Sequence, residues 1–262
     1  MLDLKRIAHE ELKRDAMTMR IFDGLSYQGT AENKWGLDLE MPQWLMDAHN
    51  THSGRTFIFG TGPSLVAQLP LLAPMQQETT WSVNRMRFWK DLPFTPTYHV
   101  IAEPGPVLNW GRNMNAVYSY PEVTQQICIN WWPVTAPRWA WVPKAPDDIQ
   151  MRWEGFFGLG DDLPPVPTGW ASPLTLAQIA AWMGFREFFF MGIDTTQTGQ
   201  AWDAIAGRTA EPRNIRSILE CFERARRDIE RAGAKIYDCT PGGLINREGA
   251  LPYVELGDVI AT

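Results

Sequence analysis

Two glycines, a proline and a serine stand together where a run of apolar, β-prone residues ends. The run covers residues 56–59, and the sequence after it is Gly60-Thr61-Gly62-Pro63-Ser64. Glycine permits backbone angles and close approaches that a β-carbon forbids, while proline and serine are typical of the first positions of a helix. Helix starts attract anions through their free N–H groups and their dipole. The stretch therefore predicts a strand, a turn and a helix start that bind a phosphate; the alternative is a tight turn without a ligand.

This turn differs from two nucleotide-binding motifs. A dinucleotide fingerprint, GxGxxG, would need a third glycine where Leu65 stands. A P-loop would need Gly-Lys-Ser/Thr, which does not follow. The turn thus predicts a nucleotide or phosphate without specifying which one.

Three further predicted strands each end at a polar residue. They are residues 79–83 before Asn84, residues 98–102 before Glu103, and residues 185–191 before a Gly-Ile-Asp turn that contains Asp194. Ligands of doubly wound parallel sheets bind beyond the carboxyl ends of the strands. We therefore expect these side chains to meet the glycine turn in one crevice.

The three side chains would have different tasks in such a crevice. Asn84 has donors and an acceptor with which to recognise a base or a hydroxyl, and Glu103 can accept hydrogen bonds from ribose or act as a base. Asp194 can contact a substrate or a cation, or it can orient its own loop by accepting backbone N–H groups. For Asn84 and Glu103 the alternative is likewise to cap a loop.

A second helix start follows at Gly169-Trp170-Ala171-Ser172-Pro173. An apolar segment, residues 174–183, comes next and ends at Gly184. Serine is a good N-cap and proline fits the first helical position, so we predict a helix with Ser172 as its N-cap. Gly169 and Ser172 therefore join the predicted nucleotide-binding residues.

The order of the predicted elements indicates an α/β fold with a Rossmann-like, mostly parallel, doubly wound sheet. The domain covers residues 54–262 and includes an amphipathic helix at residues 213–232 and a last strand at residues 235–237. Residues 1–53 form a helical prelude whose first helix would pack on the domain or mediate contacts in a homo-oligomer. The predicted helices of this prelude are residues 1–24 and residues 43–48.

Residues 106–167 are rich in tryptophan and proline and are predicted to form a lid or acceptor wall. A strand at residues 123–131 lies within them, and the alternative to a lid is a rigid structural loop. The 13 tryptophans of the chain offer broad aromatic faces that suit a planar base or a sugar, although core packing is the alternative for most of them.

Composition narrows the class of partner and the compartment. The formal net charge is −6 and the pI is about 5.3, so the chain lacks the basic footprint of a protein that binds polymeric nucleic acid. Its 3 cysteines are unclustered, which is typical of a reducing cytosol and predicts no metal site. No window approaches the roughly 20 apolar residues of a membrane span, and no signal sequence is visible, so we predict a cytoplasmic protein.

Five motifs together resemble one family of transferases. They are FIFGTGPSL, WSVNR, YHVIAEP, GFREFFFMGID and IYDCTPGG. In this order they are similar to motifs of the bacterial motility-associated-factor glycosyltransferases, the archaeal 6-hydroxymethylpterin diphosphokinases and, more distantly, the bacterial sialyltransferases that use CMP-sialic acid. The similarity spans roughly residues 54–256 and is poor over residues 106–167.

The resemblance implies a Rossmann-like transferase whose nucleotide lies across the strand ends. By the match to the sialyltransferases, residues 60–64, Asn84 and Ser172 would hold the nucleotide. Those enzymes use a histidine after the Gly-Ile-Asp turn as general base, whereas the 4 histidines of this chain all precede that turn. The acceptor proton would then pass to a carboxylate, for which the candidates are Asp194, Glu103, Asp203 and Glu211.

We therefore hypothesise a nucleotide-sugar-dependent glycosyltransferase of surface-glycan synthesis, with a CMP-nonulosonic acid as the favoured donor and a glycan or small molecule as acceptor. Direct displacement would need no metal or other cofactor, because the two helix starts would stabilise the leaving phosphate. One alternative is pyrophosphoryl transfer from ATP to a pterin alcohol, which would need Mg²⁺ near Glu103 and Asp194. The other is a noncatalytic nucleotide-binding protein, consistent with the missing histidine.

Overall fold

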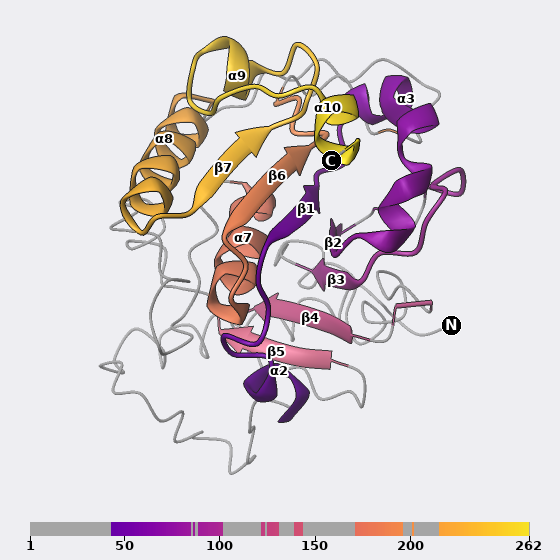
Figure 1. Cartoon of the computed structure of the whole chain (residues 1–262), viewed down its shortest axis with the longest axis vertical. Coiled ribbons are helices and arrows are strands. Elements are labelled where there is room, and N and C mark those ends of the chain that lie inside the picture. Colours follow the sequence, from indigo (N-terminus) through magenta and orange to yellow (C-terminus); the bar gives the residue numbers. More distant parts are fainter. Residues whose placement is uncertain are drawn as a thin grey trace, which may run out of the picture.

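One parallel sheet forms the centre of the structure. The computed structural model describes residues 43–84, 86, 89–101, 122–123, 125–130, 139–143, 171–195, 201 and 215–261. Within these ranges seven strands pair in the order β5-β4-β3-β2-β1-β6-β7, and every pair is parallel (Figure 1). The strands are β1 (Arg55–Phe59), β2 (Thr80–Val83), β3 (Tyr98–Ile101), β4 (Gln125–Asn130), β5 (Trp139–Pro143), β6 (Glu187–Met191) and β7 (Lys235–Asp238).

The sheet extends in two directions from β1. The chain first adds β2 to β5 on one side of β1 and then returns to add β6 and β7 on the other side. The strand order therefore reverses between β1 and β6, and such a reversal is where open α/β sheets bind ligands beyond their carboxyl ends. These two strands are paired over five residues, from Arg55 opposite Glu187 to Phe59 opposite Met191.

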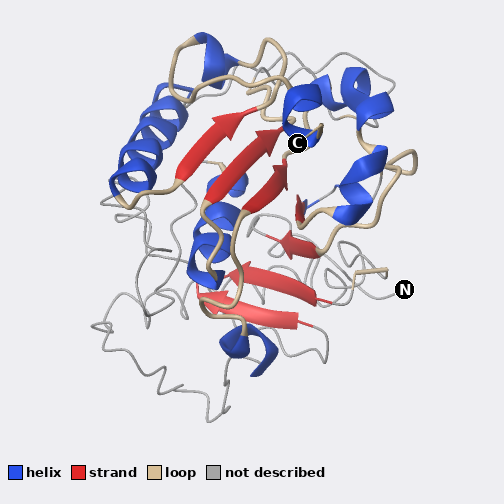
Figure 2. Ribbon diagram, viewed as in Figure 1, coloured by secondary structure: helices blue, strands red, loops and turns tan. Residues whose placement is uncertain are grey.

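Helices cover both faces of the sheet (Figure 2). One face packs against α7 (Ser172–Met183) and α8 (Ile215–Arg231), together with the short helices α2 (Gln43–Asp47) and α9 (Leu244–Arg247). The other face packs against α3 (Ser64–Gln68), the 3-10 turns η1 (Leu69–Leu71) and η2 (Ala73–Gln77), and α10 (Leu256–Ile260). This two-sided arrangement confirms the doubly wound α/β fold that the element order predicts.

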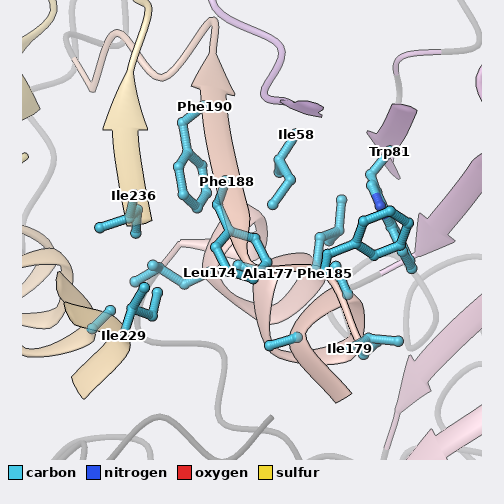
Figure 3. Close-up of a cluster of buried hydrophobic side chains, with 14 of the residues drawn as sticks. Ile58, Trp81, Leu174, Ala177, Ile179, Phe185, Phe188, Phe190, Ile229 and Ile236 are labelled. Carbon is cyan, nitrogen blue, oxygen red and sulfur yellow. The ribbon is translucent and has the colours of Figure 1, made fainter. Parts of the chain in front are cut away.

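The apolar strands bury side chains on both of these faces. Ile58, Phe188 and Phe190 belong to the cluster under α7 and α8, as Figure 3 shows. Phe57 and Phe59 belong to the cluster on the opposite face. Successive side chains of a strand point to opposite faces, so a strand that is covered on both sides reads as an unbroken apolar run.

Most of the predicted helices are confirmed, and their ends have local causes. The predicted helix after the glycine turn is short, because Pro70 has no N–H to continue the hydrogen-bond ladder and the chain turns into η1. Gly184, with a φ of 114°, ends α7, and Gly233, with a φ of 77°, follows α8. No helix in the described part of the chain is both long and apolar enough to cross a lipid bilayer.

The sequence analysis missed strand β5. Its sequence, WAWVP, lies in the stretch that was assigned to an aromatic and proline-rich excursion, yet it pairs with β4 over five residues. Within the described residues β5 is an edge strand, where a proline is tolerated because its missing N–H faces no further strand. The flanking prolines therefore give this strand the sequence signals of a loop. The predicted strand at residues 123–131 is β4; apart from β4, β5 and residues 122–123, the predicted lid lies outside the described residues, as does the predicted helix at residues 1–24.

Candidate functional site

The segments after β1, β6 and β7 meet at the carboxyl end of the sheet. In Figure 1 the arrowheads of these strands point towards the region of α9, α10 and α3. The Gly60 amide donates to the carbonyl of Met191 at 2.7 Å, and the Gly62 amide donates to the carbonyl of Gly192 at 2.9 Å. The turn after β1 therefore runs along the turn after β6, directly beyond the point where the strand order reverses.

The glycines of the turn after β1 are explained by this proximity. A β-carbon on Gly60 would collide with the carbonyl oxygen of Gly192, and one on Gly62 would collide with the carboxylate of Asp194. Neither glycine has a positive φ. Close approach, and not an unusual backbone angle, is thus the reason for glycine at both positions.

The carboxylate of Asp194 lies on the start of α3. The amide of Ser64 donates to Asp194 Oδ1 at 3.2 Å, and the hydroxyl of Ser64 donates to Oδ2 at 2.7 Å. Pro63 is the N-cap of α3 and Ser64 its first helical residue, as the sequence predicts. Burial raises the pKa of the Asp194 carboxyl, and the hydrogen bonds from Ser64 oppose that rise.

The amides at the start of α3 all have acceptors within the chain. Besides Ser64, the amide of Leu65 donates to the Gly62 carbonyl at 3.3 Å and that of Val66 to the Pro63 carbonyl at 3.1 Å. A phosphate at this helix start would therefore have to share the Ser64 donors with Asp194. Phosphate binding by residues 60–64 stays a prediction. Ser64 is the most constrained residue of this turn, because its amide and its hydroxyl both bind Asp194.

Asn84 links the end of β2 to the start of α7. Its backbone is in the left-handed region, with a φ of 49°, its side chain is buried, and its Nδ2 donates to the Ser172 hydroxyl at 3.4 Å. Ser172 is the first residue of α7, whereas Ala171, in an extended conformation, is the N-cap. The prediction of Ser172 as N-cap is therefore wrong by one position, and its hydroxyl faces Asn84 instead of the helix backbone. The structure does bring these two predicted site residues together.

The turn after β7 contains two hydrogen-bonded polar side chains that are not among the predicted site residues. The carboxylate of Asp238 is fully buried and accepts from the amide of Thr240 and from Asn246 Nδ2, both at 2.9 Å. The hydroxyl of Thr240 accepts from the amide of Ile193 at 3.0 Å. An aspartate two residues before a threonine, in a Pro-Gly-Gly turn, is a recognisable signal for such a side-chain turn.

Four predicted site residues lie outside the part of the chain that the structure describes. They are Glu103, Gly169, Asp203 and Glu211. Among the residues that the structure describes, no three His, Cys, Asp or Glu side chains lie together as metal ligands would.

Comparison with known proteins finds likeness only among solved structures. No family model matches the chain, and no curated protein matches it. The MAf glycosyltransferase from Magnetospirillum magneticum AMB-1 has a TM-score of 0.52 and 16% identity, over 80% of this chain and 35% of that one. The sialyltransferase CstII from Campylobacter jejuni, in complex with cytidine-5'-monophosphate, has a TM-score of 0.48 and 14% identity, over 77% of this chain and 85% of that one.

These likenesses concern the fold. The match to the MAf glycosyltransferase supports the Rossmann-like α/β class. It extends over only 35% of that longer protein. The MAf glycosyltransferase comes from a group whose motifs the sequence resembles. The described part of the chain is thus an α/β protein with a Rossmann-like fold similar to that of this glycosyltransferase.

Proposed function

We propose that the chain is a glycosyltransferase that takes its sugar from a nucleotide donor. The observation that carries this proposal is a set of two contacts beyond the carboxyl ends of the adjacent strands β2, β1 and β6. One contact joins the turn at residues 60–64 to Asp194, and the other joins Asn84 to Ser172 at the start of α7. The fold shared with the MAf glycosyltransferase agrees with it.

The chemistry of these segments favours a donor with a single phosphate. Thr61, Ser64, Asn84 and Ser172 offer neutral hydroxyl and amide groups, which suit ribose, a base edge and sugar hydroxyls. Asp194 adds a carboxylate whose charge would repel a triphosphate. A phosphodiester-linked donor such as a CMP-nonulosonic acid, the donor class implied by the five motifs, fits this set best.

In the proposed reaction the acceptor hydroxyl attacks the sugar carbon while the bond to the nucleotide phosphate breaks. The start of α7 lies beside Asn84 and would stabilise the charge that develops on the leaving phosphate. Asp194 is one candidate for the residue that accepts the acceptor's proton, because each carboxylate oxygen can accept a second hydrogen bond besides that from Ser64. Glu103, Asp203 and Glu211 are the other candidates.

A thermal-shift screen tests this function directly. The chain would be melted with CMP, CDP, UDP, GDP, ADP and ATP, each with and without Mg²⁺, because a ligand that binds only the folded state raises the melting temperature. We expect CMP without metal to give the largest shift and Asn84→Ala to abolish it. Arg216→Ala is the control, since Arg216 is 92% exposed on α8.

The other results of this screen have distinct meanings. A shift with ATP that requires Mg²⁺ would replace glycosyl transfer with pyrophosphoryl transfer. A shift with CMP but no acceptor-dependent release of CMP from any CMP-sugar would indicate a noncatalytic nucleotide-binding protein. The absence of any shift would contradict nucleotide binding.

A further inference from the structure

A chain of hydrogen bonds runs from the turn after β7 to the turn after β1. Thr240 holds the amide of Ile193 in the β6 turn, and Asp194, the next residue, holds Ser64 in the β1 turn. The amide of Leu244, at the start of α9, also donates to the carbonyl of Asp194, at 3.5 Å. The position of Asp194 is therefore fixed from the β7 side.

Asp238 holds the backbone of Thr240 in place. The amide of Thr240 donates to Asp238 Oδ1 and the side chain of Asn246 donates to Asp238 Oδ2, both at 2.9 Å. The hydroxyl oxygen of Thr240 in turn accepts from the Ile193 amide at 3.0 Å. An ionised Asp238 accepts hydrogen bonds at both oxygens, so it holds both donors at once.

We propose that Asp238 and Thr240 are positioning residues of the donor site, and that the negative charge of Asp238 keeps Ile193 and Asp194 in the geometry that binds the donor. This inference rests on the proposed function, because it assigns the two side chains a task in donor binding. Neither residue touches the donor; both act through the β6 turn.

The charge of Asp238 can change within the physiological range. Burial raises its pKa to about 6, and the nearby charge of Asp194 adds to the rise. The titratable side chains that interact with Asp238 in the described part of the chain are Asp194, Cys239 and Tyr253. Burial raises the pKa of Tyr253 to about 12 and also raises that of Cys239, so neither of these two side chains changes charge near pH 6.

Donor binding should therefore weaken as Asp238 becomes protonated. A protonated carboxyl carries a hydrogen on one oxygen and accepts more weakly from the Thr240 amide and Asn246, which would loosen the turn that places the Thr240 hydroxyl against the Ile193 amide. The affinity of the wild type relative to Asp238→Asn should fall about tenfold from pH 7.5 to pH 5, the usual effect of losing one hydrogen bond. Taking the ratio removes the titration of the nucleotide itself.

Two matched variants of Thr240 separate positioning from general stability. Thr240→Val has nearly the same shape and lacks the hydroxyl, whereas Thr240→Ser keeps it. We expect Thr240→Val to weaken CMP binding about tenfold and Thr240→Ser to restore it to near the wild-type value. Equal effects of the two variants would overturn the proposal, and so would an Asp238→Asn affinity with the same pH profile as the wild type.

Hydrogen exchange of single amides tests the inference without a nucleotide. In Thr240→Val the Ile193 amide should exchange about tenfold faster, while amides in the centre of β1 keep their rates. If CMP does not bind the wild type but Ile193 responds in this way, the proposed function fails and the connection to the β6 turn stands. If CMP binds and the Ile193 amide does not respond, the function stands and the inference fails.

Discussion

Asp194 and Gly62 fit together as a pair of residues from distant parts of the chain. The carboxylate of Asp194 lies where a side chain at position 62 would begin, and it uses that place to bind Ser64. Glycine at position 62 leaves room for the Asp194 carboxylate, and the carboxylate in turn excludes a larger residue at position 62. The glycine of this turn is required by a carboxylate of the same chain, so its presence alone is no proof of a bound phosphate.

Gly62→Ala should lower the free energy of unfolding by about 1–3 kcal/mol, because the new methyl group collides with the Asp194 carboxylate. In the background of Asp194→Ala the same substitution should cost much less, since the colliding group is gone. Urea denaturation of the four chains in this double-mutant cycle measures the coupling. Gly257→Ala is the control, because a β-carbon there meets nothing within 4 Å. Additive effects would show that the two residues do not touch.

Asp238 should give stability a pH dependence of its own. Its folded pKa of about 6 is above its ordinary value of 3.8, so the folded state binds the proton more tightly than the unfolded state does. Its contribution to the free energy of unfolding therefore falls as pH rises from about 4 to about 6, by roughly 3 kcal/mol at most. Urea denaturation across this range should show a smaller fall for Asp238→Asn than for the wild type. Parallel curves would contradict the raised pKa.

The glycine turn was predictable because its signal is local: an apolar run, two glycines and a helix start lie within ten residues. The partner of Ser64 was not, because Asp194 is 130 positions away and nothing in either residue type indicates the pairing. Asn84 and Asp194 could be placed in the site only through the rule that parallel strands share their carboxyl ends. Which donor of one residue meets which acceptor of another depends on tertiary packing.

At the scale of elements, α7 depends on a segment that precedes β1. The amide of Asn50 donates to the carbonyl of Trp182 at 3.2 Å, and that of His52 donates to the carbonyl of Met183 at 3.0 Å. These carbonyls belong to the last turn of α7, whose carbonyls have no partner within the helix. Gly184 completes the helix end with a left-handed backbone. The segment at residues 50–52 thereby fixes the end of α7 opposite to Ser172.

Gly184→Ala should destabilise the protein by about 2–4 kcal/mol. The alanine would suffer the strain of a positive φ, and its methyl group would also collide with the carbonyl of His52. Gly233→Ala is a matched control, because its φ is also positive and its β-carbon would meet nothing within 4 Å. Chemical denaturation should give a loss of about 1 kcal/mol for the control. Equal losses would mean that the close approach to His52 is absent.

The elements themselves were predictable to different degrees. Strands β1 and β6 are buried on both faces, so their apolar runs stand out and end at glycine turns. Strand β5 lies at the edge of the described sheet, where pairing from one side suffices and a proline is allowed. Its sequence therefore carries the signals of a loop, and only its partner β4 makes it a strand.

At the scale of the whole molecule, Arg55 ties the C-terminal helix to the start of the sheet. Its guanidinium contacts both carboxylate oxygens of Glu78, at 2.6 and 3.2 Å, and donates to the carbonyl of Val259 in α10 at 2.7 Å. A planar guanidinium can donate to all of these acceptors at once, which an ammonium group cannot do. One side chain thus joins β1, the segment before β2 and α10.

Arg55→Lys should lower the free energy of unfolding by about 1–2 kcal/mol, because it breaks the paired contact and the bond to α10. Lys235→Met is the comparison: that lysine pairs with Glu187 at 2.7 Å but is 59% exposed, so solvent screens the pair and its loss should cost less than the change at Arg55. Thermal unfolding of both variants measures the difference. A cost for Arg55→Lys no larger than that of the comparison would show that α10 does not depend on this residue.

The order of the strands also determines when the site can exist during synthesis. Strand β1 ends at Phe59, but its neighbour β6 begins only at Glu187, and the side chains that fix the β6 turn come later still, at Asp238 and Thr240. A ribosome makes about 5–20 residues each second, so the glycine turn waits many seconds for its partners. During that time the edge of β1 that pairs with β6 in the folded protein lacks its partner strand, and the candidate site cannot form until residues 187–240 have been made.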